Sequence, residues 1–267
     1  MRQINKNELF QILKRVASEA ASLYSDHPLD YKGRVVTPQG VVETGLHPNN
    51  ADIVEATVGN TFGERIRILD VGVAYGIYDV VLKRMFGFEV YGIDHPANMN
   101  SYCRYPIQQG IQILPCDPIY EKLPYADETF DTIIASEVVE HLLISPKVLF
   151  SKIYPLVKPG GKLIVTTPNF ASLHNITLVI RGFNPAGQFP DKDFLNRKEI
   201  IDPRVHPREY TVREIEEALL DSGFKIFSIQ TKTNNTTNGC SWKLKFLQFL
   251  TKFTPKHKER IVAIGVR

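Results

Sequence analysis

An aspartate and two glycines at the end of an apolar run form the first group of residues that could do chemistry. The run ends in Asp70, and Gly72 and Gly76 follow it. A glycine-bearing turn between a strand and a helix lets the backbone approach a ligand, and the free amides of the helix start attract a polar ligand group. The nicotinamide-dinucleotide fingerprint does not fit, because Ala74 and Ile77 stand where its second and third glycines belong.

Two further aspartates each follow an apolar run. Asp94 ends FEVYGID, and Asp117 comes two residues after IQILP. The carboxyl ends of parallel strands are where such sheets bind ligands. There, a carboxylate after the second strand can accept hydrogen bonds from a ribose diol, and one after the third can accept from an adenine amino group. Aspartate also ends strands simply because it suits caps and turns, but the ordered set with Gly72 and Gly76 favours a nucleoside ligand.

A second chemical group follows the fourth apolar run, FDTIIAS. Glu137, Glu140 and His141 are spaced to share one face of a helix that we expect to begin there. Two carboxylates and an imidazole could hold a divalent cation such as Mg²⁺ or Mn²⁺, which would lower the pKa of a bound hydroxyl. Without a cation, Glu137 would cap the helix, Glu140 would pair with an arginine, and His141 would be a candidate general base.

The elements that must position these residues alternate between strands and helices from residue 65 onward. Helices are expected at 77–86, at 146–157 and after the capping box of Thr211 and Glu214. The apolar runs that indicate strands are RIRILDV, FEVYGID, IQILP, FDTIIAS, KLIVTTP, FKIFSIQ and RIVAIGV. This alternation predicts an α/β fold with a doubly wound, mostly parallel, seven-stranded sheet.

The beginning of the chain and two long irregular stretches lie outside this alternation. Apolar residues at three- and four-residue steps predict an amphipathic helix over 6–24, and the prolines and glycines of 25–60 predict a turn-rich strap or lid. The interpretation is therefore an N-terminal segment, 1–60, and a domain, 61–267, with insertions at 168–207 and 231–258. Such insertions in compact domains are often functional.

The overall composition is that of an ordinary globular protein. The 267 residues are 43% hydrophobic and 23% charged, with a net charge of +3, which excludes disordered, collagen-like and coiled-coil classes. The three cysteines form no CxxC pair, so a reducing cytoplasm is the expected location. The sequence begins without a signal-peptide core and has no run of the ~18 apolar residues that a spanning helix needs. Any membrane contact is therefore expected to be peripheral.

A basic and aromatic stretch near the end of the chain is the main charge asymmetry. Residues 241–260 carry a local net charge of +5, which leaves −2 for the remainder. The stretch could lie in a membrane interface or grip a polyanion. Packing on its own domain, or a homodimer formed through 241–258, is the favoured interpretation. A nucleic-acid partner is disfavoured, because RNA recognition usually adds a broad basic groove.

Taken together, the motifs resemble those of class I S-adenosylmethionine-dependent methyltransferases. The resemblance rests on the 70–76 turn, Asp94, Asp117, FDTIIASEVVEHL and LVKPGGKLIVTTPN. It implies a Rossmann-like fold and S-adenosylmethionine as the cofactor. By motif, the cofactor contacts fall on Asp70, Gly72, Ala74, Gly76, Asp94, Asp117 and Ser136. Ala74 departs from the pattern, since many members have a glycine at this position.

The ExxEH segment resembles that of small-RNA 2′-O-methyltransferases and of quinone-precursor O-methyltransferases. This resemblance covers a short part of the sequence. It implies a metal site at Glu137, Glu140, His141 and His206. Without metal, His141 or His206 becomes the catalytic base.

The runs TPNFASLHN and HPREYT are similar to those of methyltransferases found with bacterial glycan and polysaccharide biosynthesis. They imply a sugar hydroxyl as the acceptor, with Asn169, Arg181 and Arg208 as candidate substrate donors, although several of these are more simply read as surface residues. The expected activity is O-methylation of a sugar or glycan intermediate. The alternatives are a phenolic quinone-type precursor, the 3′ end of an RNA, or a non-catalytic protein that binds the cofactor or assists assembly.

Overall fold

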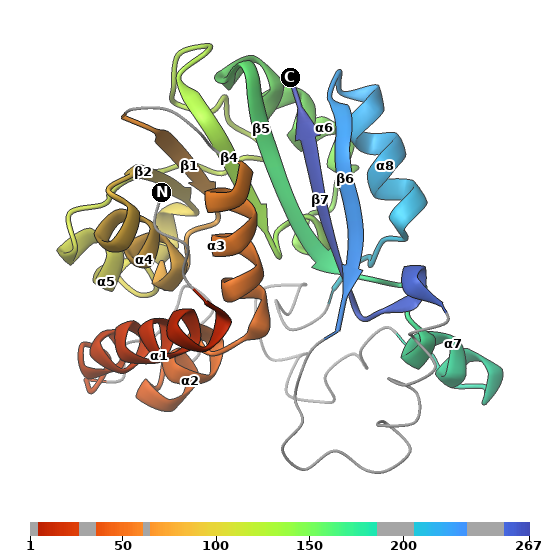
Figure 1. Cartoon of the computed structure of the whole chain (residues 1–267), viewed down its shortest axis with the longest axis horizontal. Coiled ribbons are helices and arrows are strands. Elements are labelled where there is room, and N and C mark those ends of the chain that lie inside the picture. Colours follow the sequence, from red (N-terminus) through yellow and green to blue (C-terminus); the bar gives the residue numbers. More distant parts are fainter. Residues whose placement is uncertain (1–4, 27–35, 61–64, 186–205, 234–253) are drawn as a thin grey trace. The chain divides into compact units, whose positions relative to one another are not determined.

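Seven strands form one sheet in the computed structural model, which describes residues 5–26, 36–60, 65–185, 206–233 and 254–267 (Figure 1). The strand order is β3-β2-β1-β4-β5-β7-β6, and β1 pairs in parallel with both β2 and β4. This arrangement confirms the predicted doubly wound, mostly parallel, Rossmann-like sheet. The strands are β1 (Arg67–Val71), β2 (Glu89–Asp94), β3 (Gln112–Pro115), β4 (Phe130–Ser136), β5 (Val157–Pro168), β6 (Lys225–Lys232) and β7 (Arg260–Val266).

The helices begin and end where local sequence signals place them. At α4, Gly76 is the N-cap and Gly87 the C-cap, and the capping box of Thr211 and Glu214 starts α8 as predicted. Among the described residues no helix combines the length and the apolar character needed to cross a membrane. The helices are α1 (Lys6–Ser22), α2 (Pro38–Gly45), α3 (Pro48–Asn60), α4 (Ile77–Phe86), α5 (Arg104–Gln108), α6 (Pro146–Ile153), α7 (Leu173–Ile180) and α8 (Val212–Asp221).

The chain divides into two compact units. Unit 1 consists of Met1–Ser136, Ser151–Ile164 and Val266–Arg267, and unit 2 consists of Glu137–Phe150 and Val165–Gly265. Unit 1 contains β1 to β4 with the helices α1 to α5, and unit 2 contains α7, α8 and β6. Parts of both predicted insertions, 186–205 and 234–253, lie outside the described residues, and so does most of the 241–258 stretch.

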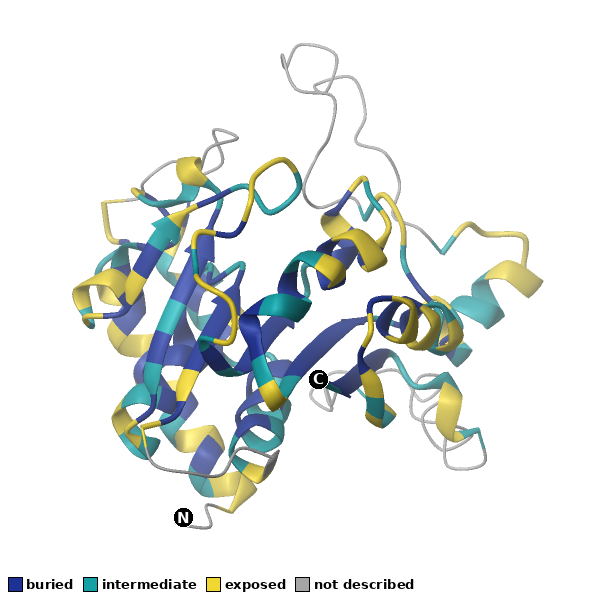
Figure 2. Cartoon of the chain, turned by 90° about the horizontal axis from the view of Figure 1, so that it is seen from above, coloured by how far each residue is buried: buried dark blue, intermediate teal, exposed yellow. Residues whose placement is uncertain are grey.

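The N-terminal helices pack into the core of unit 1. The buried face of α1 includes Leu9, Leu13 and Val16, and α1 lies against α2, α3 and α4 (Figures 1 and 2). The helix predicted over 6–24 is confirmed. The turn-rich strap expected for 25–60 is wrong for the part that forms α2 and α3, because a proline in the first turn suits a helix as well as a loop.

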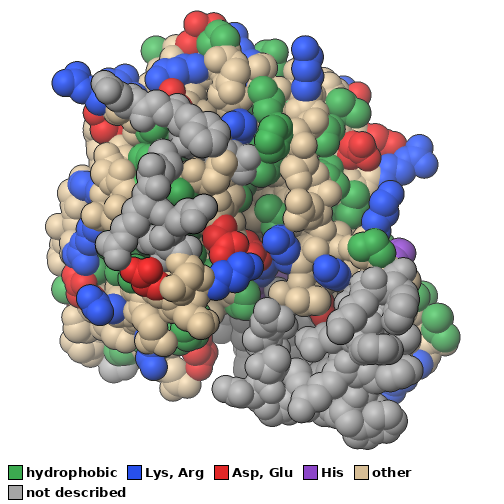
Figure 3. Space-filling model, viewed as in Figure 1, with side chains coloured by type: hydrophobic (Ala, Val, Ile, Leu, Met, Phe, Trp, Pro, Cys, Tyr) green, Lys and Arg blue, Asp and Glu red, His purple; other side chains and the backbone are tan. Residues whose placement is uncertain are grey.

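Several charged side chains of unit 1 form ion pairs at its surface. Arg84 Nη2 lies 2.8 Å from Glu19 Oε1, and Arg104 Nη1 lies 2.9 Å from Asp26 Oδ2. On the face that Figure 3 shows, lysines and arginines lie interspersed with aspartates and glutamates.

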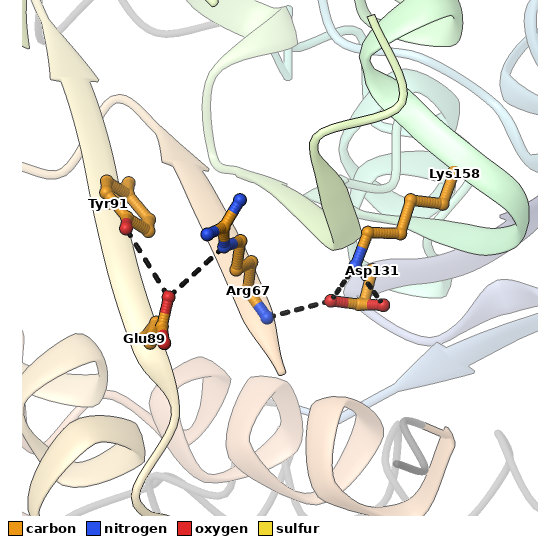
Figure 4. Close-up of polar contacts among 5 residues, drawn as sticks. All are labelled: Arg67, Glu89, Tyr91, Asp131 and Lys158. Atoms are coloured by element: carbon orange, nitrogen blue, oxygen red, sulfur yellow. Dashed lines mark hydrogen bonds and ion pairs between the residues drawn. The ribbon is translucent and has the colours of Figure 1, made fainter. Parts of the chain in front are cut away.

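A polar network ties together the amino-terminal ends of the strands, which Figure 4 shows. Asp131 at the start of β4 accepts from the Arg67 backbone N at 2.9 Å and from Lys158 Nζ at 2.8 Å. Arg67 Nε in turn donates to Glu89 Oε2 at 3.2 Å, and Tyr91 donates to the same oxygen. The network fixes the sheet at the edge opposite to the predicted ligand end, which makes its residues useful controls.

Candidate functional site

The turn after β1 has a backbone conformation that favours glycine. Gly72, Ala74 and Gly76 have φ angles of 84°, 48° and 57°. A Cβ atom at Gly76 would lie 2.6 Å from Pro106 Cβ, so this position excludes any side chain. The turn leads directly into the first residue of α4, Ile77. It therefore presents bare backbone and helix-start amides at the carboxyl end of β1, as the sequence predicts.

Asp94, at the end of β2, connects this turn to the next strand. Its Oδ2 accepts from Ala74 N at 2.8 Å, and its Oδ1 accepts from His95 N and from Asn98 Nδ2, both at 2.7 Å. Asn98 Oδ1 is buried and accepts no hydrogen bond from any residue that the structure describes. A carboxylate has about four lone-pair sites, so Asp94 and this amide oxygen can accept from the two hydroxyls of a ribose.

The remaining predicted cofactor residues lie at the same end of the strands of unit 1. Asp117 follows β3, and its Oδ2 lies 3.9 Å from His95 Nε2. Ser136 ends β4, and its Oγ accepts from Asn49 Nδ2 at 2.7 Å. Asn49 belongs to the first turn of α3, so an N-terminal helix also reaches this edge. The sequence did not indicate His95, Asn98 or Asn49, because their positions depend on how the chain folds back over the strand ends.

Asp70 is placed differently from the other cofactor candidates, because its side chain is completely buried beneath the turn. Its Oδ2 accepts from Tyr78 Oη at 2.7 Å. Its other oxygen, Oδ1, and both oxygens of buried Asp79 accept no hydrogen bond from the described residues. Burial, and then the charge of Asp70, raises the pKa of Asp79 well above its usual range. We infer that the two carboxyls share one proton, so that an oxygen of one carboxyl donates to an oxygen of the other.

Asp79→Asn should therefore change how stability depends on pH. Between the unfolded carboxyl pKa of about 3.9 and the raised folded pKa, the native state holds a proton that the unfolded state lacks. The free energy of unfolding of the wild type consequently falls as pH rises through this window, by up to about 1.4 kcal/mol per pH unit. Asparagine keeps a hydrogen-bond donor and does not titrate. The free energy of unfolding of the variant should therefore rise relative to that of the wild type between pH 5 and 7.

Urea unfolding of both proteins across that range measures the effect. The exposed Asp127→Asn serves as the control and should follow the wild-type curve. Parallel pH curves for the wild type and Asp79→Asn would contradict the shared proton.

The ExxEH segment of unit 2 does not open a regular helix, which corrects the expectation from its spacing. Only Val139–His141 forms a short 3-10 turn, and Glu137 has a left-handed φ of 52°. Tertiary contacts with β5 hold the segment in this conformation and prevent a regular helix. Glu137 N donates to the Thr166 carbonyl oxygen at 2.9 Å, and Glu140 Oε2 accepts from Thr167 Oγ1 at 2.9 Å.

Three of the four predicted metal ligands nevertheless come together. One ligand atom each from Glu140, His141 and His206 lies within 4.8 Å of the others, and the two imidazole rings are 4.9 Å apart. Glu140 is 1% exposed, and its Oε1 lies 4.0 Å from His141 Nε2 without accepting a hydrogen bond from the described part of the chain. Burial, and then nearby Glu137, raises the pKa of Glu140.

An orphaned carboxylate oxygen facing imidazole nitrogens suits a divalent cation, which would remove the penalty of burying this charge. Glu137 stands outside this trio. Its Oε1 accepts from Thr166 Oγ1 at 2.9 Å, and buried Arg260 partly offsets the rise in its pKa that burial causes. We therefore assign Glu137 to the support of the trio through β5.

The candidate substrate residues have three different environments. Asn169 is 1% exposed, and its Nδ2 donates to the carbonyl oxygens of Lys256 and Lys258 at 3.0 and 2.7 Å. It therefore fixes the segment that leads into β7. Arg181 is exposed at the end of α7, with its guanidinium 5.2 Å from the Phe183 ring centroid. Arg208, by contrast, lines a cavity.

This cavity lies within unit 2 and has a volume of about 540 Å³, which is in the range of small-molecule sites. Its wall begins at Leu142 and at Pro207, the residues that directly follow His141 and His206. The lining residues are Leu142, Leu143, Ile144, Ser145, Pro146, Lys147, Pro207, Arg208, Tyr210, Glu214, Glu217, Ala218 and Asp221. The cavity is thus next to two members of the trio along the chain, with an apolar wall and a charged wall.

Comparisons with known proteins show what this fold and the turn after β1 are similar to. Residues 69–165 match a family model described as a methyltransferase domain. The mitochondrial ubiquinone biosynthesis O-methyltransferase of Mus musculus is 30% identical over 183 residues, covering 63% of this chain and 48% of that protein. Phosphoethanolamine N-methyltransferase 3 of Arabidopsis thaliana is 34% identical over 105 residues, covering 38% of this chain and 20% of that protein.

Solved structures share the architecture. A SAM-dependent methyltransferase from Archaeoglobus fulgidus has a TM-score of 0.55 at 18% identity, over 82% of this chain and 94% of that one. One from Mesorhizobium loti has a TM-score of 0.53 at 18% identity, over 82% and 98%. The chain spans less than two thirds of the length of the curated relatives it matches, at 20%, 37% and 60% for three of them. Residues 69–165 therefore match a methyltransferase domain, and the fold is shared with solved S-adenosylmethionine-dependent methyltransferases.

Proposed function

We propose that the chain is an O-methyltransferase that transfers the methyl group of S-adenosylmethionine to a hydroxyl of a sugar or glycan intermediate. The observation that carries this proposal is the trio of Glu140, His141 and His206, with its orphaned carboxylate oxygen. A hydroxyl must lose its proton as the methyl group is transferred.

The proposed roles divide between the two units. In unit 1, the backbone of the 72–76 turn holds the methionine end of the cofactor, and Asp94 with Asn98 accepts from its ribose. In unit 2, the trio would hold Mg²⁺ or Mn²⁺, which would lower the pKa of an acceptor hydroxyl. Without a cation, an imidazole of the trio takes the proton. The methyl sulfonium is a strong electrophile, so the residues chiefly bind and align.

The charges of the unit 2 cavity support an uncharged acceptor. Lys147 Nζ lies 3.0 Å from Asp221 Oδ2, and Arg208 pairs with Glu214. Both cations that the structure describes in the lining are thus paired, so neither is free to bind a phosphate. A sugar offers hydroxyls for the charged wall and a C–H face for Leu142 and Pro146. A vicinal diol is also what a cation at the trio could chelate.

A phenolic quinone precursor is the second candidate, because the names of several curated relatives specify ubiquinone biosynthesis. Its vicinal hydroxyls suit the same trio. RNA is disfavoured, since the sequence outside residues 241–260 has a net charge of −2, whereas RNA recognition usually adds a broad basic groove.

Titration calorimetry with S-adenosylmethionine and S-adenosylhomocysteine, with chelator and then with Mg²⁺ or Mn²⁺, tests the proposal first. We expect micromolar binding of both that does not depend on the cation. Methyl transfer is then measured on neutral glycosides and on a catechol, with and without the cation. Transfer to a glycoside supports the proposal, and transfer to the catechol alone supports the second candidate. Absence of cofactor binding would contradict both and would favour a non-catalytic role.

A further inference from the structure

A carboxylate that the motif analysis did not consider contacts the histidine of the trio. Glu209 Oε1 lies 3.0 Å from His206 Nδ1. The side chain of Glu209 is 15% exposed and that of His206 is 29% exposed, so solvent competes only partly for this contact. The two residues are three positions apart in the chain, within the HPREYT run.

The second oxygen of Glu209 is anchored from a different element. Asn175 Nδ2, in the first turn of α7, donates to Glu209 Oε2 at 3.2 Å. Asn175 is itself fixed, because its backbone N donates to the N-cap Ser172 Oγ at 3.2 Å. Both carboxylate oxygens therefore have partners on opposite sides, and Glu209 cannot turn away from His206 without losing the contact to Asn175.

We propose that Glu209 is a positioning residue that keeps the proton of neutral His206 on Nδ1 and leaves Nε2 as the atom with the free lone pair. An ionised carboxylate only accepts hydrogen bonds, so the ring nitrogen that faces it must carry hydrogen. A neutral imidazole has one N–H, and the hydrogen bond made by one nitrogen decides the state of the other. Nε2 is then the atom that binds a cation or takes a proton.

This inference gives the insertion after β5 a specific task. Residues 172–175 hold Glu209, and Glu209 holds the imidazole, so α7 acts on the trio through Glu209. Partners of this kind orient metal-bound histidines, and their loss typically costs about 10- to 100-fold in metal affinity. The use of Nε2 rests on the proposed function, whereas the position of the proton does not.

The test reads the tautomer directly, by long-range ¹⁵N–¹H correlation spectra of His206 at pH 8. We expect the wild type to carry hydrogen on Nδ1, and Glu209→Ala to shift His206 toward the Nε2–H form. Glu216→Ala is the matched control, because Glu216 is an exposed glutamate of α8 that is not among the residues lining the cavity. Asn175→Ala, which retains Glu209, should give a smaller shift in the same direction.

A parallel titration with Mn²⁺ alone measures the consequence. We expect a 10- to 100-fold weaker affinity for Glu209→Ala and no change for Glu216→Ala. Hydrogen on Nε2 in the wild type would overturn the inference without any variant, and so would an unchanged tautomer in a folded Glu209→Ala. If the wild type binds no Mn²⁺, the proposed cation site fails, while the spectra still decide the role of Glu209.

Discussion

Asp94→Ala should weaken the binding of S-adenosylmethionine by on the order of 100-fold, as measured by titration calorimetry. The carboxylate is 5% exposed, and hydrogen bonds to a charged group contribute about 1.5–3 kcal/mol each. The substitution removes the acceptor for the ribose and also releases the Ala74 N–H, which shapes the turn. Two such losses correspond to at least a hundredfold, because about 1.4 kcal/mol is a factor of ten.

Asp131→Ala is the matched control for this experiment. It removes the same charge and also frees a backbone N–H, that of Arg67, but at the amino-terminal edge of the same sheet (Figure 4). We expect it to lower the free energy of unfolding by about 1 kcal/mol and to leave cofactor affinity unchanged. Equal affinity losses in the two variants would mean that Asp94 acts only through stability, and wild-type affinity in Asp94→Ala would remove it from the cofactor site.

His206→Ala should lower turnover by about 10²- to 10⁴-fold, the usual contribution of a positioned acid or base, while the cofactor still binds. The expected reason is loss of the Nε2 lone pair, whether it binds a cation or takes a proton. Single-turnover methyl transfer and calorimetry on the same sample separate chemistry from cofactor binding.

The matched control is His174→Ala, because His174 is an exposed histidine of unit 2 on α7. Its turnover should equal that of the wild type. A His206→Ala enzyme with full turnover would end the catalytic assignment of this histidine, and weakened cofactor binding would indicate a structural role.

The cofactor end of the sheet could be predicted because it depends on local patterns. Apolar runs that end in Asp94 and Asp117 become parallel strands, and parallel topology brings their ends to one edge. The buried proton of Asp70 and Asp79 could not be predicted in this way. In the sequence, Asp79 is only an acidic residue near the start of a helix. An exposed aspartate at such a position would simply stabilise the helix through its dipole.

The trio could be predicted only in part, because its geometry comes from contacts distant in the chain. Spacing suggested one helix face for Glu137, Glu140 and His141, but hydroxyls on β5 hold both glutamates and replace the helix with a turn. His206 was found through a motif. The three-residue spacing between His206 and Glu209 was the sequence feature that could have indicated their contact. Spacing alone does not predict the loop conformation that brings the two side chains together.

Ala74 has a bearing on how this class of protein is found by sequence. A left-handed alanine costs about 1–2 kcal/mol of strain, whereas glycine at the same place would give the unfolded chain extra freedom worth about 0.4–1 kcal/mol. At a φ of 48°, the second effect therefore offsets part of the first. A search pattern that insists on glycine at this position would discard this chain, although its turn is intact.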